Sequence, residues 1–288
     1  MKRRSTLFAF LATFGAAIAP AGQVAAQTVS DLAGKTHIHG LAFDRTDPAR
    51  IYIATHHGLM RSAGDGSVER VSATADDFMG FVPHPSDPAV FYASGHPQGG
   101  GNLGLIRSDD GGKTWEQLSP GVDGPVDFHQ LAVSPGDPAV LYGAFGGIQA
   151  SRDGGKSWER VGDAPAALID LAVSPADPDT VYAATENGLM ISRDGAASWR
   201  MARAGAPVTA VETMPDGRVL AFAYGEGLLR AEPDSTEFAV VESAVPGGTY
   251  LLHLAADPDD DRRLLAAAGG KVVLVSTDGG ATWSQPGK

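Results

Sequence analysis

Several side chains in the first half of the chain have the chemistry of metal ligands. Imidazole, thioether and carboxylate groups together suit copper or zinc. A lone histidine more often bonds to a neighbouring backbone than to a metal, so the prediction depends on whether the fold gathers these residues. The candidate metal ligands are His37, His39, His56, His57, Met79, His96 and His129.

Two aspartates allow a different chemistry. Glycoside hydrolysis uses a pair of carboxyl groups about 5–10 Å apart, and Asp77 and Asp127 are the candidate catalytic pair. The alternative is that both carboxylates cap the start of a strand by hydrogen bonding. The chain has neither a Gly-x-Ser-x-Gly elbow nor a phosphate-binding loop with a lysine, so serine hydrolase and nucleotide chemistry have no support.

An internal repeat must position these residues. The four tryptophans are spaced by about 42 residues or twice that distance, and each ends one copy of the pattern Ser-x-Asp-x-Gly-x-x-Trp. Degenerate copies at Ser62 to Val68 and at Ala231 to Phe238 bring the number of units to six. The aspartate and glycine favour a tight turn, and the tryptophan has a large apolar face to pack between sheets. The four copies are Ser108–Trp115, Ser151–Trp158, Ser192–Trp199 and Ser276–Trp283.

Each unit has the length of four short strands, which is one blade of a β-propeller. We therefore predict an all-β fold, a six-bladed β-propeller with four-stranded blades and Asp-box turns. The inner strands should start near residues 36, 76, 126, 166, 207 and 249, and residues 28–34 should add a strand that closes the ring.

The repeated pattern resembles the Asp box, or BNR repeat, of several propeller families. These include sialidases, other glycoside hydrolases, sortilin-type receptors and photosystem II assembly factors. The chain is similar to exported bacterial proteins labelled exo-α-sialidase-like or glycosyl hydrolase. That resemblance implies action on glycans, but the Phe-Arg-Ile-Pro segment of sialidases is absent and their arginine triad is not recognisable here.

The repeat register places the candidate ligands on one face. His39, Met79 and His129 occupy matching positions in the first three inner strands, and the residues two positions earlier are His37, Asp77 and Asp127. Since strand residues i and i+2 share a side, each pair should point the same way. His56, His57 and His96 fall in the loops after the second strands, and a glycine-rich insertion follows His96. His84 and His253 do not fit this register and are interpreted as structural.

The first 26 residues have the order of a signal peptide. Lys2, Arg3 and Arg4 precede an apolar run and then small residues, with Gln27 as the expected mature start. We expect residues 1–26 to be removed, residues 27–288 to form a single propeller domain without a transmembrane anchor, and the protein to be periplasmic or secreted. The chain has no cysteine, so we expect no disulfide and no cysteine-linked lipid anchor.

Charge narrows the choice of partner. The net charge is −12, which disfavours nucleic acid. The expected partner is a periplasmic protein, a metal ion or a glycan, and the expected oligomeric state is a monomer. Two functions stay open at this point: a binding propeller with a histidine-rich copper or zinc pocket or a protein-interaction scaffold, and, as the alternative, a sialidase-like glycoside hydrolase.

Overall fold

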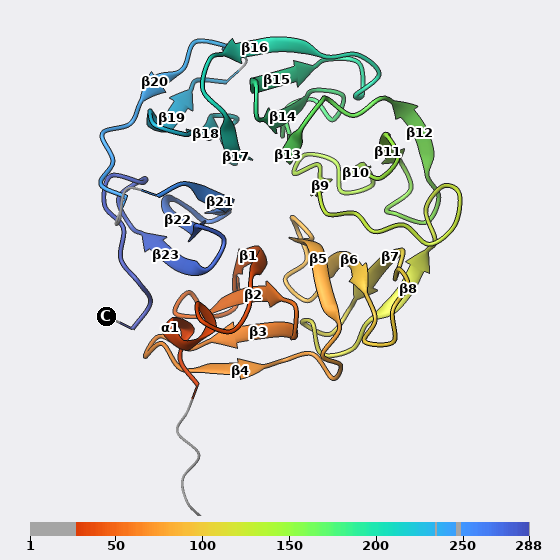
Figure 1. Cartoon of the computed structure of the whole chain (residues 1–288), viewed down its shortest axis with the longest axis vertical. Helices are drawn as coiled ribbons and strands as arrows, with labels where there is room; N and C mark the ends of the chain where they lie inside the picture. Colours follow the sequence, from red (N-terminus) through yellow and green to blue (C-terminus); the bar gives the residue numbers. More distant parts are fainter. Residues whose placement is uncertain (1–26, 234, 246–248, 288) are drawn as a thin grey trace, which may run out of the picture.

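A computed structural model describes residues 27–233, 235–245 and 249–287. The expected signal peptide lies outside these residues. Six small antiparallel sheets stand around a central axis, with the first sheet beside the last (Figure 1). The six-bladed β-propeller predicted from the repeat is confirmed.

The blades follow one another along the chain, and within each blade the strands run in sequence order from the axis to the rim. Blades one to three contain β1 (Ile38–Phe43), β2 (Ile51–Thr55), β3 (Gly58–Ser62), β4 (Val68–Arg70); β5 (Asp77–Pro83), β6 (Phe91–His96), β7 (Leu105–Ser108), β8 (Glu116–Ser119); β9 (Leu131–Val133), β10 (Leu141–Ala144), β11 (Ile148–Ser151) and β12 (Glu159–Gly162). Blades four to six contain β13 (Leu168–Val173), β14 (Val181–Thr185), β15 (Gly188–Ser192), β16 (Arg200–Ala204); β17 (Val208–Thr213), β18 (Val219–Ala223), β19 (Gly227–Ala231), β20 (Ala239–Val240); β21 (Leu251–Asp257), β22 (Asp260–Ala268) and β23 (Val272–Ser276).

In the sixth blade, residues near the end of the described chain occupy the place of the fourth strand. Its sheet has three strands, and Ser284 pairs with Val275 of β23 through an isolated antiparallel bridge. Both backbone hydrogen bonds of that bridge form, at 2.8 and 2.9 Å.

The ring closes between blades six and one. The inner strands β1 and β21 are in contact, as are the other neighbouring inner strands. The strand expected at residues 28–34 is a wrong prediction, because this segment contains the short helix α1 (Val29–Leu32), capped by Thr28 and packed near β23. Thr28 itself pairs with Ser67 in one isolated bridge. Among the described residues, no helix is long and apolar enough to cross a membrane.

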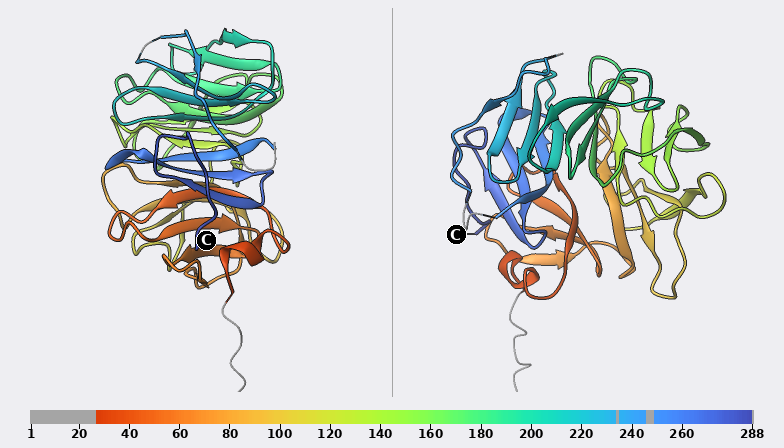
Figure 2. Two further views of the ribbon diagram at one scale, coloured as in Figure 1. Left: turned by 90° about the vertical axis from the view of Figure 1, so that its left-hand side faces the viewer. Right: turned by 45° about the horizontal axis from the view of Figure 1, so that its top comes forward.

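The hydrophobic core is divided among the junctions between blades. Each cluster of buried side chains draws on two neighbouring blades, and one of them joins Val29 and Leu32 of α1 to Leu265 and Val273 of blade six. Burying an aliphatic side chain contributes roughly 1.5–3 kcal/mol. Apolar contacts therefore hold each blade to its neighbours, and Figure 2 shows the ring of blades from two further directions.

The Asp-box turns have the geometry that their residues predict. In the first tryptophan-containing copy, the Asp110 carboxylate accepts hydrogen bonds from the amides of Lys113 and Thr114 at 3.0 and 2.9 Å. These bonds, with those from hydroxyl groups, help to lower the pKa of Asp110 to about 2, against an opposing effect of desolvation. Trp115 donates to the carbonyl of Gly112 at 2.9 Å and packs between blades one and two.

The third tryptophan-containing copy departs from the pattern. Ala196 occupies the place of Gly112, and it has the same left-handed backbone, with φ of +67° against +85°. Its side chain is fully buried in the core between blades three and four. An alanine in this conformation is strained, and apolar burial offsets that cost.

The inner strand of blade three starts later than expected. The sequence predicts a start near residue 126, whereas β9 begins at Leu131. The preceding segment bonds to blade two instead, because the amide of Phe128 donates to Ser94 Oγ at 2.9 Å and the carbonyl of Val126 accepts from Gly104 at 3.0 Å. Asp127 and His129 are thereby held against blade two.

Candidate functional site

The candidate ligands fall into two groups, each at a junction between blades. We call His37, His39, His56 and Asp77 the blade 1–2 group, and His96, Asp127 and His129 the blade 2–3 group. His39, His56 and Asp77 offer ligand atoms within 4.8 Å of one another, and so do all three residues of the blade 2–3 group. The register of the repeat brings these residues together from separate strands and loops.

His56 is at the centre of the blade 1–2 group. It lies in the hairpin between β2 and β3, and its Nε2 is 3.2 Å from both His37 Nδ1 and His39 Nε2. On the other side of the ring, Nδ1 is 2.8 Å from Asp77 Oδ2. A tetrahedral ion with ligands at 2.0–2.1 Å places neighbouring ligand atoms about 3.3 Å apart. The spacing of these nitrogens is close to that value.

The environment of His39 favours a neutral imidazole. Burial is the main cause that lowers the pKa of His39 to about 4, and the nearby His56 and His129 lower it further. The charge of Asp77 acts in the opposite direction. A neutral imidazole keeps a free nitrogen lone pair, which is the form that binds a metal.

Asp127 is at the centre of the blade 2–3 group. Its buried carboxylate places Oδ2 2.7 Å from His129 Nε2 and 3.0 Å from His96 Nε2. The hydrogen bond with Asp127 is the main cause that raises the pKa of His129. One carboxylate oxygen thus faces two imidazole rings.

The glycine-rich insertion of blade two fixes the orientation of His96. Its Nδ1 is 2.8 Å from the carbonyl oxygen of Gly101, to which it can only donate. In the neutral ring, Nε2 then carries a lone pair that points at Asp127. The Nε2 of His96 and the carboxylate of Asp127 are both acceptors, so a proton or a cation must lie between them for this contact to be favourable. The insertion is in turn tied to blade three, because Asn102 donates to the carbonyl of Pro125 at 3.0 Å.

Both carboxylates have one unsatisfied oxygen. Oδ1 of Asp77 and Oδ1 of Asp127 are buried and have no hydrogen-bond partner. A buried acceptor without a partner is costly and rare in folded proteins. A bound cation would satisfy such an oxygen.

Two of the predicted ligands lie outside these groups. His57 is exposed, next to His56 in the hairpin, and Met79 is buried in β5, two residues beyond Asp77. His84, interpreted as structural, accepts from the amides of Ser86 and Asp87 in its own turn.

The sequence did not single out two titratable residues on the inner strands of blades four and five, Asp170 and Glu212. Burial raises the pKa of Asp170 to about 7 and that of Glu212 to about 8, and Asp170 contributes to the second shift. His253, with its pKa lowered to about 4 by burial, bonds to the backbone of Ile38 in blade one. Polar residues within apolar inner strands are the signal that would have identified this set.

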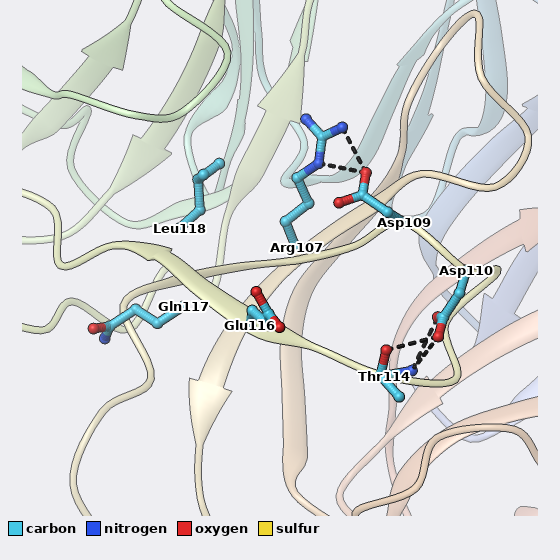
Figure 3. Close-up of a pocket in the computed structure, with 7 residues that line it drawn as sticks. All are labelled: Arg107, Asp109, Asp110, Thr114, Glu116, Gln117 and Leu118. Atoms are coloured by element: carbon cyan, nitrogen blue, oxygen red, sulfur yellow. Dashed lines mark hydrogen bonds and ion pairs between the residues drawn. The ribbon is translucent and has the colours of Figure 1, made fainter.

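Cavities also occur on the outer part of the ring. One cavity of about 260 Å³ is lined by Arg107, Asp109 and Asp110 together with residues of β8 (Figure 3). Asp110 there bonds to Thr114 of the same Asp-box turn, and Arg107 pairs with Asp109. These contacts belong to the Asp-box turn and the strand that leads into it, which favours a structural role for the residues that make them.

Fold and turns together define the class of the protein, a six-bladed β-propeller with Asp-box turns and a histidine-rich face. Residues 99–288 match the family model described as photosynthesis system II assembly factor YCF48. The chain belongs to this family. The family match does not bear on the sialidase-like label, which stays a prediction.

Individual relatives agree with the family match. The photosystem II assembly lipoprotein Ycf48 of Synechococcus sp. (strain CC9902) is 23% identical over 258 residues, which cover 86% of this chain and 75% of the relative. The solved structure of YCF48 bound to D1 peptide superposes with a TM-score of 0.54 at 18% identity, covering 87% of this chain and 82% of that one.

A glycoside hydrolase also shares the fold. The GH74 xyloglucanase from Xanthomonas campestris has a TM-score of 0.59 at 19% identity, over 90% of this chain and 46% of the enzyme. The chain spans less than half of that enzyme, and at this identity the likeness shows the fold alone.

Proposed function

We propose that the protein is an exported binding propeller whose histidine-rich face holds a copper or zinc ion. The observation that carries this proposal is the gathering of imidazoles at two blade junctions, each around a carboxylate with an unsatisfied buried oxygen. Imidazole nitrogen and carboxylate oxygen are the ligands that zinc and copper take from such residues. Periplasmic or secreted localisation rests on the signal-peptide pattern of residues 1–26.

The geometry of the face fits reversible metal binding better than it fits a closed structural metal site. The three ligands of the blade 2–3 group would leave one position of a tetrahedral ion open. The side chains of His96 and His129 are 41% and 50% exposed, so an ion beside them would be reachable from solvent.

The second candidate function is a protein-interaction scaffold. Membership of an assembly-factor family favours it, and one solved relative, YCF48, is bound to a D1 peptide. The two functions are compatible, since an ion with an open position offers a point of attachment for a partner.

Glycoside hydrolysis by Asp77 and Asp127 is a weaker proposal. Each carboxylate already faces imidazole rings through Oδ2, and Asp127 is buried. A general acid and a nucleophile both need access to the sugar. A carboxylate that is occupied in this way suits metal ligation better.

The test is thermal unfolding of protein purified without a histidine tag. Zinc or copper should raise the melting temperature, because a ligand that binds only the native state stabilises it by about 2.7 kcal/mol at a hundred times its Kd. Magnesium, which prefers oxygen ligands, should have little effect. The double variant His39→Ala, His129→Ala should stay folded and lose the response. A melting temperature that neither ion changes would contradict the proposal.

A further inference from the structure

We propose that the histidine-rich face binds two metal ions, one at each blade junction, next to each other on blade two. This inference rests on the proposed function and adds the number and placement of the ions. It follows from how the ligand atoms divide between the two groups.

The two groups share no residue. His39, His56 and Asp77 form one set of ligand atoms within 4.8 Å, and His96, Asp127 and His129 form a separate set. Ligands at 2.0–2.1 Å from one ion lie at most about 4.2 Å apart. Side-chain rotations of a few tenths of an ångström would bring each set within that limit, so each set can surround its own ion with one carboxylate and at least two imidazoles.

The unsatisfied oxygens also come in a pair, one in each group. Asp77 Oδ1 is buried without a hydrogen-bond partner in the blade 1–2 group, at 3.9 Å from His39 Nε2, and Asp127 Oδ1 is buried without one in the blade 2–3 group. A single ion at one junction would leave the other oxygen unsatisfied. One ion at each junction, bound through the free Oδ1, would satisfy both.

Blade two connects the sites. Asp77 at the start of β5 and His96 at the end of β6 are direct partners across the two strands, although they belong to different groups. Residues opposite each other on antiparallel strands have Cα atoms about 4.5–5.5 Å apart and side chains on one face of the sheet. Two divalent ions at this separation repel each other, so we expect the second to bind more weakly than the first.

The experiment is isothermal titration of the untagged protein with zinc chloride, with bound zinc measured by elemental analysis after gel filtration. The variants replace one exposed or partly exposed histidine in each group, so that the fold is retained. The wild type should bind two equivalents in unequal steps. His56→Ala and His129→Ala should each bind one equivalent, and the double variant should bind none. His57→Ala is the matched control and should still bind two, because the exposed imidazole of His57 lies outside both groups.

The outcomes separate this inference from the proposed function. One equivalent in the wild type, abolished by either single variant, would overturn the two-ion inference and leave metal binding intact. Loss of an ion from His57→Ala would overturn the assignment of the ligands. Binding of no zinc or copper by the wild type would overturn the proposed function itself.

Discussion

At the scale of residues, His56 shows how one side chain can organise a site. One ring nitrogen faces two other imidazoles and the second faces Asp77. If Nε2 binds an ion, Asp77 accepts from Nδ1 and fixes the ring, which is the usual support for a metal-bound histidine. If Asp77 binds the ion directly, its free Oδ1 becomes a ligand. Both arrangements use the same residues.

Register arguments predicted these residues because they need only the alternation of a strand and the spacing of the repeat. Most of the predicted residues lie at two blade junctions, whereas His57 and Met79, which the same register predicted, lie outside both groups. The partition into two groups was not predictable, because it depends on ring orientation. Gly101 orients His96, and no pattern in the sequence specifies that contact.

The Asp-box tryptophans carry a prediction about stability. Trp158 packs in the core between blades two and three and donates to Ser119 Oγ at 3.0 Å. Trp158→Ala should lower the free energy of unfolding by about 3–5 kcal/mol, as other large aromatic truncations do. Trp158→Phe keeps most of the packing and should cost less. Denaturant unfolding measures both, and zinc affinity of the folded fraction should not change. An unchanged midpoint for Trp158→Ala would show that this residue does not stabilise the blade junction.

At the scale of elements, the position and length of a strand depend on the neighbouring segments as well as on the residues of the strand itself. The apolar runs and turns predicted four strands per blade, but β9 is short because its preceding segment bonds to blade two. Residues 28–34 have apolar positions that suit a strand, yet Thr28 and Asp31 form a capping box and start α1 instead. Local side-chain bonds of this kind compete with strand pairing.

Asp170 on β13 and Glu212 on β17 carry a prediction about pH. Burial raises the pKa of Glu212 to about 8 and Asp170 adds to the shift, whereas the hydrogen bond that Glu212 accepts from the backbone of Ala256 in blade six opposes it. The unfolded chain loses this proton near pH 4.5 and the folded chain keeps it, so stability falls as pH rises from about 4.5 to 8. Glu212→Gln keeps the shape and removes the titration. Its stability relative to wild type should increase from pH 5 to pH 9 in urea unfolding curves. A constant difference across that range would mean that Glu212 does not keep its proton in the folded state. Asp170→Asn is the companion variant and should act in the same direction.

At the scale of the whole molecule, each blade junction has a hydrophobic core, and two of the junctions also have a cluster of histidine and aspartate side chains. The first and last blades meet through apolar contacts of α1, β1 and blade six. The number of blades was predictable because tryptophan spacing fixes the repeat length. The repeat also predicts a fourth strand of blade six near Trp283, and in the described chain a single bridge at Ser284 stands in that position. The acidic chain favours cations over phosphate backbones, in line with a metal-binding face.

The most direct test of the metal-binding face is anomalous X-ray diffraction from crystals soaked in zinc, recorded on both sides of the zinc absorption edge. The account predicts anomalous peaks at the blade junctions, about 2.0–2.1 Å from imidazole nitrogens of His39, His56, His96 and His129. Crystals of His39→Ala, His129→Ala protein should lose these peaks. Soaked wild-type crystals with no anomalous peak at either junction would contradict the account.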